Sequence, residues 1–244
     1  MPNWVYGQYA IKGTKKNVLA LLNVGIKCSG FAPRKKCETA FEFLKSNAKT
    51  KTSNFCYDGE NKAGTSAEKP ATIVYENKLT LDTFRPMPDS FKLYDTTNCA
   101  KDMPEIAKEQ KQQYGCVGWY DWGLKYRGTK WNTELSDVEL SVDDETATLK
   151  FECNTAWCYP DEWLRWVRDM FNVSVLLCVN EEGGAFDFYG ELDGDENDMD
   201  CSGGPNKEDF EDEDDYWDAV YEHNEGCKES MRCAFADYVA GYMV

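Results

Sequence analysis

The sequence contains only one histidine, His223, among its 244 residues, and histidine is the commonest metal ligand in proteins. Its cysteines also lack the C-x-x-C spacing of zinc knuckles, since the close pairs are Cys153 with Cys158 and Cys227 with Cys233. A Cys–His nucleophile would have to use His223, and nothing in the sequence orients that side chain. We therefore expect no metal, no cofactor and no catalytic residues.

Long apolar runs are also missing. No run approaches the 18 residues of a membrane span. The opening residues Met1-Pro2-Asn3-Trp4 lack the charged and apolar regions of a signal peptide. These absences predict a cytoplasmic protein with no membrane partner, whose eleven cysteines are mostly reduced thiols.

Positive charge is scarce, with 27 Lys and Arg against 44 Asp and Glu, a net charge of −17. Contacts to a nucleic-acid backbone need clustered Lys and Arg. The sequence therefore argues against direct nucleic-acid binding and favours a partner protein with a basic surface.

The acidity is concentrated near the C-terminus. Residues 191–215 contain thirteen acidic residues and one lysine, Lys207. We predict an acidic interaction surface there, with a solvated tail that keeps the protein soluble as the alternative. Its candidate residues are Asp193, Asp195, Asp198, Asp200, Glu208, Asp209, Glu211, Asp212, Glu213, Asp214 and Asp215.

The start of this acidic segment partly resembles a calcium-binding loop. From Asp193, oxygen-bearing side chains alternate at the first, third and fifth positions. The sixth position is Asp198, where the loop needs Gly, and the twelfth is Gly204, where it needs Glu. A solvated acidic loop is therefore favoured over a calcium site.

Tryptophans are abundant in the middle of the chain, next to Gly, Thr and Asn. We expect Trp119, Trp122, Trp131 and Trp157 to form part of the core, with each indole N–H bound to a loop carbonyl. The alternative is a pocket for a small ligand such as a nucleotide, because aromatic rings beside cationic and amide groups suit a base. Its residues would be Trp119, Arg127, Lys130, Trp131 and Asn132.

The apolar periodicity predicts an α+β fold, an antiparallel sheet with helices packed on one face. A helix capped by Thr14 should follow the first strand, and Gly128 should end a later helix with a positive φ. The expected strands are residues 4–11, 72–81, 138–142, 146–153, 173–179 and 185–192, and the expected helices begin near residues 15, 104, 114 and 160. Trp163, Trp166, Val167, Met170 and Phe171 should form the apolar face of the last of these helices.

The chain should divide into two parts. Residues 1–192 form the α+β domain, with an inserted loop region at about residues 25–70, and residues 193–244 form an acidic loop and a helical extension. Apolar residues between Tyr216 and Val239 have helical spacing and enough bulk to dock on the main body.

Six motifs resemble the YubB-type ferredoxin-like proteins of plasmids and phages, over residues 1–13 and 79–192. They are Met1-Pro2-Asn3-Trp4, Phe84-Arg85-Pro86-Met87-Pro88, Trp119-Tyr120-Asp121-Trp122, Gly128-Thr129-Lys130-Trp131-Asn132, Thr155-Ala156-Trp157 and Glu181-Glu182-Gly183-Gly184. The resemblance implies a ferredoxin-like sandwich and a home on a mobile genetic element, with no established activity. Many relatives have Ser-Pro-Pro where this chain has Cys158-Tyr159-Pro160, so no hydroxyl chemistry is transferred to this position.

Together these features favour a non-enzymatic phage or plasmid protein in the host-cell cytoplasm. It would bind a host protein or defence complex, with its carboxylates occupying a basic groove as nucleic-acid phosphates do. The alternative is a module that sequesters or converts a small ligand at the tryptophan motifs. Asp121 is the one acid set directly among aromatic residues, and a single carboxylate does not make a hydrolase.

Overall fold

A computed structural model describes residues 2–28, 71–74, 79–92, 103–198 and 204–242. Most of the predicted insertion at residues 25–70 lies outside these ranges, and so does Asp200 of the predicted acidic surface. Of residues 25–28, of residues 71–74 and of Asp198, only the backbone is described.

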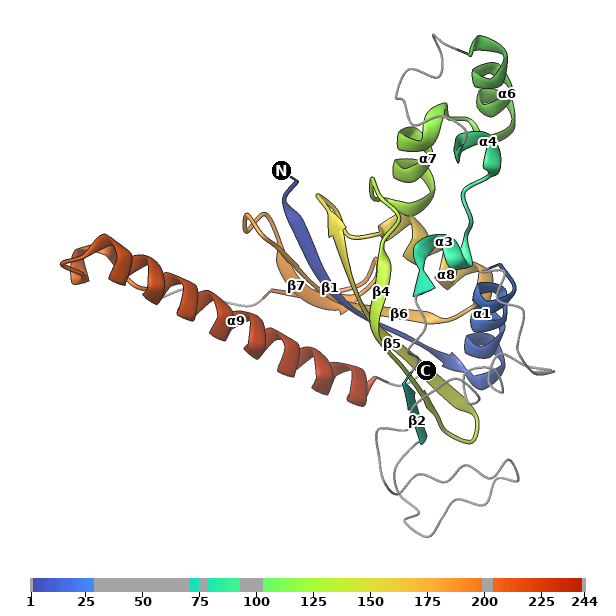
Figure 1. Cartoon of the computed structure of the whole chain (residues 1–244). Helices are drawn as coiled ribbons and strands as arrows, with labels where there is room; N and C mark the ends of the chain where they lie inside the picture. Colours follow the sequence, from blue (N-terminus) through green and yellow to red (C-terminus); the bar gives the residue numbers. More distant parts are fainter. Residues whose placement is uncertain (1, 29–70, 75–78, 93–102, 199–203, 243–244) are drawn as a thin grey trace.

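One antiparallel sheet organises the domain (Figure 1). Its central strand β1 (Trp4–Thr14) pairs with β5 (Thr146–Ala156) on one side and β6 (Ser174–Glu181) on the other. The strands follow the order β2-β4-β5-β1-β6-β7-β8, and the short β3 pairs with β4. The outer strands are β2 (Ala71–Val74), β3 (Leu79–Thr80), β4 (Glu134–Val142), β7 (Asp187–Glu191) and β8 (Glu196–Asp198).

The first strand and helix agree with the sequence pattern. Alternation along β1 places Val5, Tyr9 and Ile11 in the main core. Helix α1 (Lys15–Cys28) begins where the Thr14 hydroxyl accepts a hydrogen bond from the backbone N–H of Asn17, at 3.3 Å. The predicted cap is confirmed, and the buried residues Val18, Leu21 and Leu22 pack on the sheet.

Two further helices complete this face of the sheet, α3 (Leu81–Phe84) and α8 (Asp161–Phe171). Trp163 of α8 is fully buried, and its indole N–H donates to the Leu81 carbonyl at 3.1 Å. Met170 is 65% exposed, so the prediction that it joins the apolar face of this helix is wrong. The buried stripe is narrower than the run of apolar residues indicates, because one helix side contacts the sheet.

A smaller core lies beyond one end of the sheet (Figure 1). It is formed by α4 (Asp89–Lys92), α6 (Pro104–Tyr114) and α7 (Gly118–Arg127), with Phe91 and Trp122 at its centre. Both rings are almost completely buried. This unit positions the tryptophan motifs relative to the sheet.

Boundaries in this region differ from the sequence prediction. Of the strand predicted at residues 72–81, residues 72–74 belong to β2, residues 79–80 to β3 and Leu81 to α3, and residues 75–78 lie outside the described ranges. The helix predicted at 114–126 begins at Gly118, because Gly115 takes a left-handed conformation (φ 70°) and ends α6. Gly128 ends α7 with φ 82°, which confirms the predicted cap.

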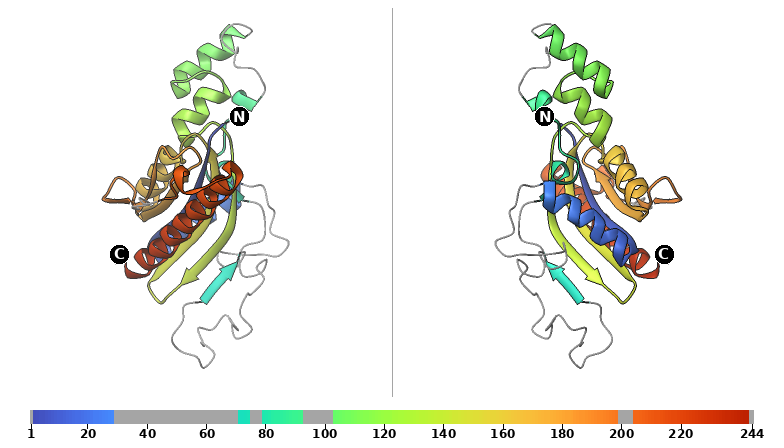
Figure 2. Two further views of the ribbon diagram at one scale, coloured as in Figure 1. Left: turned by 90° about the vertical axis from the view of Figure 1, so that its left-hand side faces the viewer. Right: turned by 90° about the vertical axis from the view of Figure 1, so that its right-hand side faces the viewer.

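The longest helix, α9 (Glu213–Gly241), lies on the opposite face of the sheet (Figure 2). The predicted packing of helices on one face of the sheet therefore holds for α1, α3 and α8 only. The C-terminal helix covers the other face, so the described domain has three layers. The α9 residues Met231, Phe235 and Val239 are buried against Ala10 and Leu176. The small side chain of Ala10 leaves room for the helix on this face.

Candidate functional site

The C-terminal half of α9 is firmly attached to the sheet. Besides the buried apolar contacts, the Tyr242 hydroxyl donates to a carboxylate oxygen of Glu191 at 2.6 Å. The ammonium group of Lys12 donates to the Val239 carbonyl at 3.3 Å and also to that of Tyr242. Lys12 thus supplies the positive charge that the helix lacks in its own last turn.

The N-terminal half of α9 is not buried against the sheet. None of residues 213–230, all of which are described, is buried. Figure 1 shows this half extending beyond the sheet on the side of β7. Asp212 caps it by accepting from the Asp214 N–H at 2.7 Å, and acidic residues in the first turn favour the helix dipole. The sequence therefore stabilises this half locally, without core contacts.

The stripe that docks α9 continues into this free half. Positions 217, 221, 224, 228, 231, 235 and 239 follow one another at the three- and four-residue steps of one helix face. In the C-terminal half this stripe is buried, whereas Trp217 is 56% exposed and Tyr221 is 67% exposed. Two large aromatic rings thus lie in solvent along the line of an existing interface.

Carboxylates flank these rings. Asp214, Asp218 and Glu225 are exposed and lie within one helical step of Trp217 or Tyr221. We call these five residues the acidic aromatic face. Aromatic residues are enriched at the centres of protein interfaces, where a polar rim surrounds them.

The predicted acidic residues are distributed over several structures. Asp193 holds Arg165 and Arg168 of α8 at 2.9 and 2.8 Å, and the bonds to Arg165 and Arg168 lower the pKa of the Asp193 carboxyl. Lys207 pairs with Glu213 at 2.6 Å. The remaining described side chains of the set are exposed: Asp195, Glu208, Asp209, Glu211, Asp212, Asp214 and Asp215.

All five residues of the alternative ligand pocket line one cavity of about 360 Å³. We call it the aromatic pocket. It is lined by Asp82, Met87, Phe91, Lys92, Trp119, Arg127, Lys130, Trp131 and Asn132. The structure thus brings the predicted set together from α7 and the loop that follows it.

Two members of this set have structural partners. Arg127 is only 2% exposed, and its Nε and Nη2 donate to the Asp82 carboxylate at 2.7 and 2.8 Å. Such a paired geometry makes burial of the guanidinium tolerable. The Asn132 side-chain oxygen accepts from the Asp82 N–H at 3.0 Å. Arg127 therefore fixes α3 against the end of α7, and Asn132 fixes it against the loop that follows.

The expectation that the tryptophans of the motifs form the core is wrong for two of them. Trp131 is 36% exposed and Trp157 is 44% exposed. The Lys130 ammonium lies 4.6 Å from the Trp131 ring centroid and 5.0 Å from that of Trp157. Lys130 thus makes cation–π contacts with the faces of both rings at the surface. Trp119 is half-buried, and its indole N–H has no partner among the described residues.

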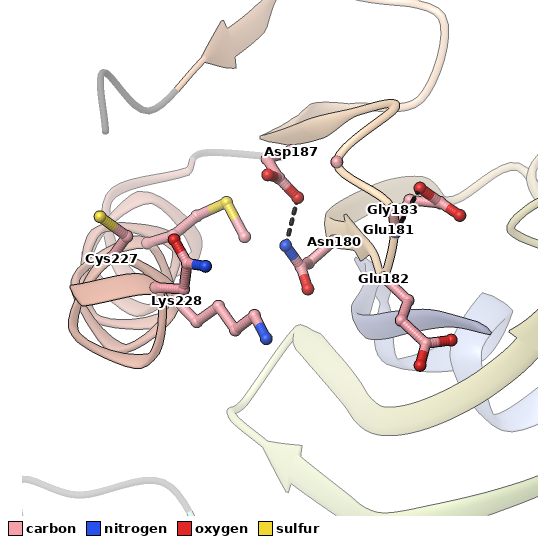
Figure 3. A pocket seen from close by; sticks show the side chains of 10 residues that line it. Asn180, Glu181, Glu182, Gly183, Asp187, Cys227 and Lys228 are labelled. Carbon is pink, nitrogen blue, oxygen red and sulfur yellow. Dashed lines mark hydrogen bonds between the residues drawn. The ribbon is translucent and has the colours of Figure 1, made fainter. Parts of the chain in front are cut away.

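A second cavity of about 260 Å³ lies between α9 and the turn that joins β6 to β7 (Figure 3). We call it the hairpin pocket. It is lined by Asn180, Glu181, Glu182, Gly183, Gly184, Asp187, Asn224, Cys227, Lys228 and Met231. The sequence prediction missed it, although Asn180 and Glu181 stand out as polar residues at the end of an apolar strand.

Glu181 builds the turn of this pocket. Its carboxylate accepts from the backbone N–H groups of Gly183 and Ala185 at 2.8 and 3.0 Å. These bonds, led by that from Ala185, lower the pKa of the Glu181 carboxyl. Gly184 has φ 73°, a conformation that favours glycine. The Gly183-Gly184 turn predicted from the sequence is confirmed.

Cysteine and metal chemistry find little support in the described residues. Burial raises the pKa values of the Cys153 and Cys178 thiols to about 12, which keeps them protonated. Cys227 Sγ lies 3.6 Å from His223 Nε2, one helical turn away. Within the described ranges, no three His, Cys, Asp or Glu side chains are grouped as metal ligands.

Comparison with known proteins gives no family. No protein-family model and no curated protein matches the chain. Among solved structures, the crystal structure of protein api92 from Yersinia pseudotuberculosis, assigned to family model DUF1281, aligns over 84% of this chain and 100% of that chain. The identity is 11% and the TM-score is 0.35, too low to support an argument. In the described residues no helix is both long and apolar enough to cross a membrane.

Proposed function

We propose that this protein is a non-enzymatic binding protein that docks the acidic aromatic face of α9 onto a basic surface of another protein. The observation that carries the proposal is the exposure of Trp217 and Tyr221 on the continuation of a buried stripe. Removing such rings from water on binding is favourable, and the flanking carboxylates select a partner of opposite charge.

The proposed cellular setting follows from the sequence motifs. We place the protein with the YubB-type ferredoxin-like proteins of phages and plasmids, acting in the host-cell cytoplasm on a host protein or defence complex. The strand order β4-β5-β1-β6, with α1 after β1 and α8 after β5, supports a ferredoxin-like core. In this proposal the carboxylates of α9 occupy a site where the partner binds nucleic-acid phosphate.

Quantitative affinity capture from host lysate tests the proposal with three variants. Trp217→Ala with Tyr221→Ala removes the rings, and Asp214→Asn with Asp218→Asn removes two charges. Asp143→Asn with Asp144→Asn removes two exposed charges at the distant β4–β5 turn and serves as the control. We expect the wild type and the control to capture one or more basic proteins. Neither α9 variant should capture these proteins. Equal capture by all four would contradict the proposal.

Competition with duplex DNA tests the mimicry. DNA should displace the captured partner if the carboxylates occupy its phosphate site, and the displacement should weaken as salt is raised. A partner that binds DNA and this protein at the same time would contradict mimicry while leaving the docking surface intact.

A second candidate function is favoured by the convergence of five predicted residues on the aromatic pocket. We propose that an aromatic ring with an anionic group, as in a nucleotide, stacks on Trp131 beside Lys130. A nucleotide at one hundred times its Kd would stabilise the protein by about 2.7 kcal/mol. That corresponds to a rise in Tm of about 5–10 °C, measurable by thermal shift. No shift with mono-, di- and cyclic nucleotides would exclude this function.

A further inference from the structure

We propose that the hairpin pocket binds the guanidinium group of an arginine side chain, which the basic partner presents while it contacts the acidic aromatic face. The inference depends on the proposed function for the source of the arginine. It depends on the pocket alone for the guanidinium chemistry. The pocket beside α9 combines one buried acceptor without a donor, the Asn180 side-chain oxygen, with carboxylates that also hold the turn (Figure 3).

The first acceptor is the side-chain oxygen of Asn180. Asn180 is only 8% exposed, its amide nitrogen donates to Asp187, and its Oδ1 is buried with no partner among the described residues. In Figure 3 the Asn180 oxygen points away from Asp187 into the pocket. A buried carbonyl without a donor is costly. A ligand that donates a hydrogen bond removes this cost.

The pocket is also negatively charged. Three carboxylates line it, those of Glu181, Glu182 and Asp187, against one ammonium group, that of Lys228. Lys228 Nζ lies 3.0 Å from Glu225, which is outside the lining. Burial raises the pKa of the Asp187 carboxyl, although the hydrogen bond from Asn180 and the charge of Lys228 act in the opposite direction. These charges exclude an anionic ligand and favour a cation.

The arrangement suits a guanidinium better than other cations. A guanidinium has five N–H donors in one plane, so it bonds an amide oxygen and a carboxylate at the same time. An ammonium is a compact and strongly hydrated charge, which is less suited to acceptors spread over a cavity of about 260 Å³. The described residues also show no cluster of metal ligands here.

The pocket lies where a docked partner would reach it. Asn224, Lys228 and Met231 line it and belong to the helix stripe that contains Trp217 and Tyr221. Along the helix axis, Asn224 is about 4.5 Å from Tyr221. A partner that covers the two rings can therefore place an arginine in the pocket without contacting another part of the sheet.

NMR titration of the whole isotope-labelled chain with N-acetyl-arginine amide tests the guanidinium site. We expect saturable shifts of the Asn180 side-chain amide and of the Gly183 and Gly184 backbone, and much weaker shifts with N-acetyl-lysine amide. Asp187→Asn should weaken binding about tenfold, as loss of a charged hydrogen bond does. The control Asp143→Asn, with the same change in charge at the distant β4–β5 turn, should leave the affinity unchanged.

Lys228→Gln provides a test that does not alter the strand residues. Removing the resident cation should strengthen binding of the arginine amide about two- to fivefold. The inference is overturned if Asn180 shows no saturable shift, or if Asp187→Asn and Lys228→Gln both bind like the wild type. If the arginine-binding test fails but partner capture still needs Trp217 and Tyr221, the proposed function stands. If the arginine amide binds but partner capture does not depend on Trp217 and Tyr221, the guanidinium site is supported and the docked partner is excluded as the source of the arginine.

Discussion

Among the described residues, Arg127 is the most completely buried charged side chain, and its partner Asp82 neutralises its charge. Asp82→Ala leaves the guanidinium buried without a carboxylate. We expect this change to lower the free energy of unfolding by about 3 kcal/mol, measured by urea denaturation. The matched control is Asp89→Ala, which breaks the exposed pair with Lys92 and should cost less than about 1 kcal/mol. Equal losses would contradict the structural role of Arg127.

Asp193 gives a prediction about pH. Its pKa is lowered by Arg165 first and then by Arg168. The stabilisation is therefore present above the unfolded pKa of about 3.9 and is lost as pH falls through the lower folded pKa. Because these groups are partly exposed, Asp193→Asn should destabilise the protein by only about 0.5–1 kcal/mol at pH 7.

Urea denaturation at neutral and strongly acid pH measures this effect. The difference between Asp193→Asn and wild type should vanish at acid pH, where the wild-type carboxyl is protonated. The exposed neighbour Asp195→Asn is the control and should change stability by less than about 0.5 kcal/mol. A difference for Asp193→Asn that persists at low pH would show that its ion pairs are not the cause.

The tryptophans show how far the burial of a single residue can be predicted from the sequence. Trp163 was predicted on an apolar helix face, and it is buried with its N–H satisfied. Trp131 and Trp157 occur in equally distinctive motifs but lie at the surface beside Lys130. An indole is stable in either place, since it is apolar with one polar end. The motif alone therefore does not distinguish core from surface.

At the scale of elements, α9 is attached to the sheet through its C-terminal half. Phe235→Ala should weaken the docking of the C-terminal half by about 3 kcal/mol, because it empties a buried site between helix and sheet. Hydrogen exchange should then show lost protection in residues 231–241, with β1 and β6 little changed. Tyr221→Ala is the control and should leave exchange unchanged, because the ring is exposed. Equal loss in both variants would contradict the division of α9.

Elements with strong local signals were predictable from the sequence. Alternation along β1 and the Thr14 cap specified the first strand and helix, and the Gly183-Gly184 turn joined β6 to β7. The candidate binding surfaces on α9 and in the hairpin pocket could be located only from the three-dimensional structure. Helical spacing indicated that residues 216–239 would dock, but it did not show that docking stops near Met231. The unpaired oxygen of Asn180 depends on how the hairpin faces α9.

In the whole molecule, charge and exposed aromatic surface coincide on α9. The net charge of −17 acts at long range and favours encounter with basic partners. In the proposed function, the two rings act on contact and determine how long the complex lasts. In the same proposal, α9 provides both the attraction and the docking surface, and the sheet holds the C-terminal half of the helix in place.

Site-specific photo-crosslinking in host cells tests this claim most directly. A photo-reactive benzoylphenylalanine replaces Tyr221, which is 67% exposed, or Met170 of α8, which is 65% exposed and lies outside the acidic aromatic face. We expect a crosslink from position 221 to a basic host protein and none to that protein from position 170. No such crosslink at 221, or the same protein crosslinked equally from both positions, would contradict it.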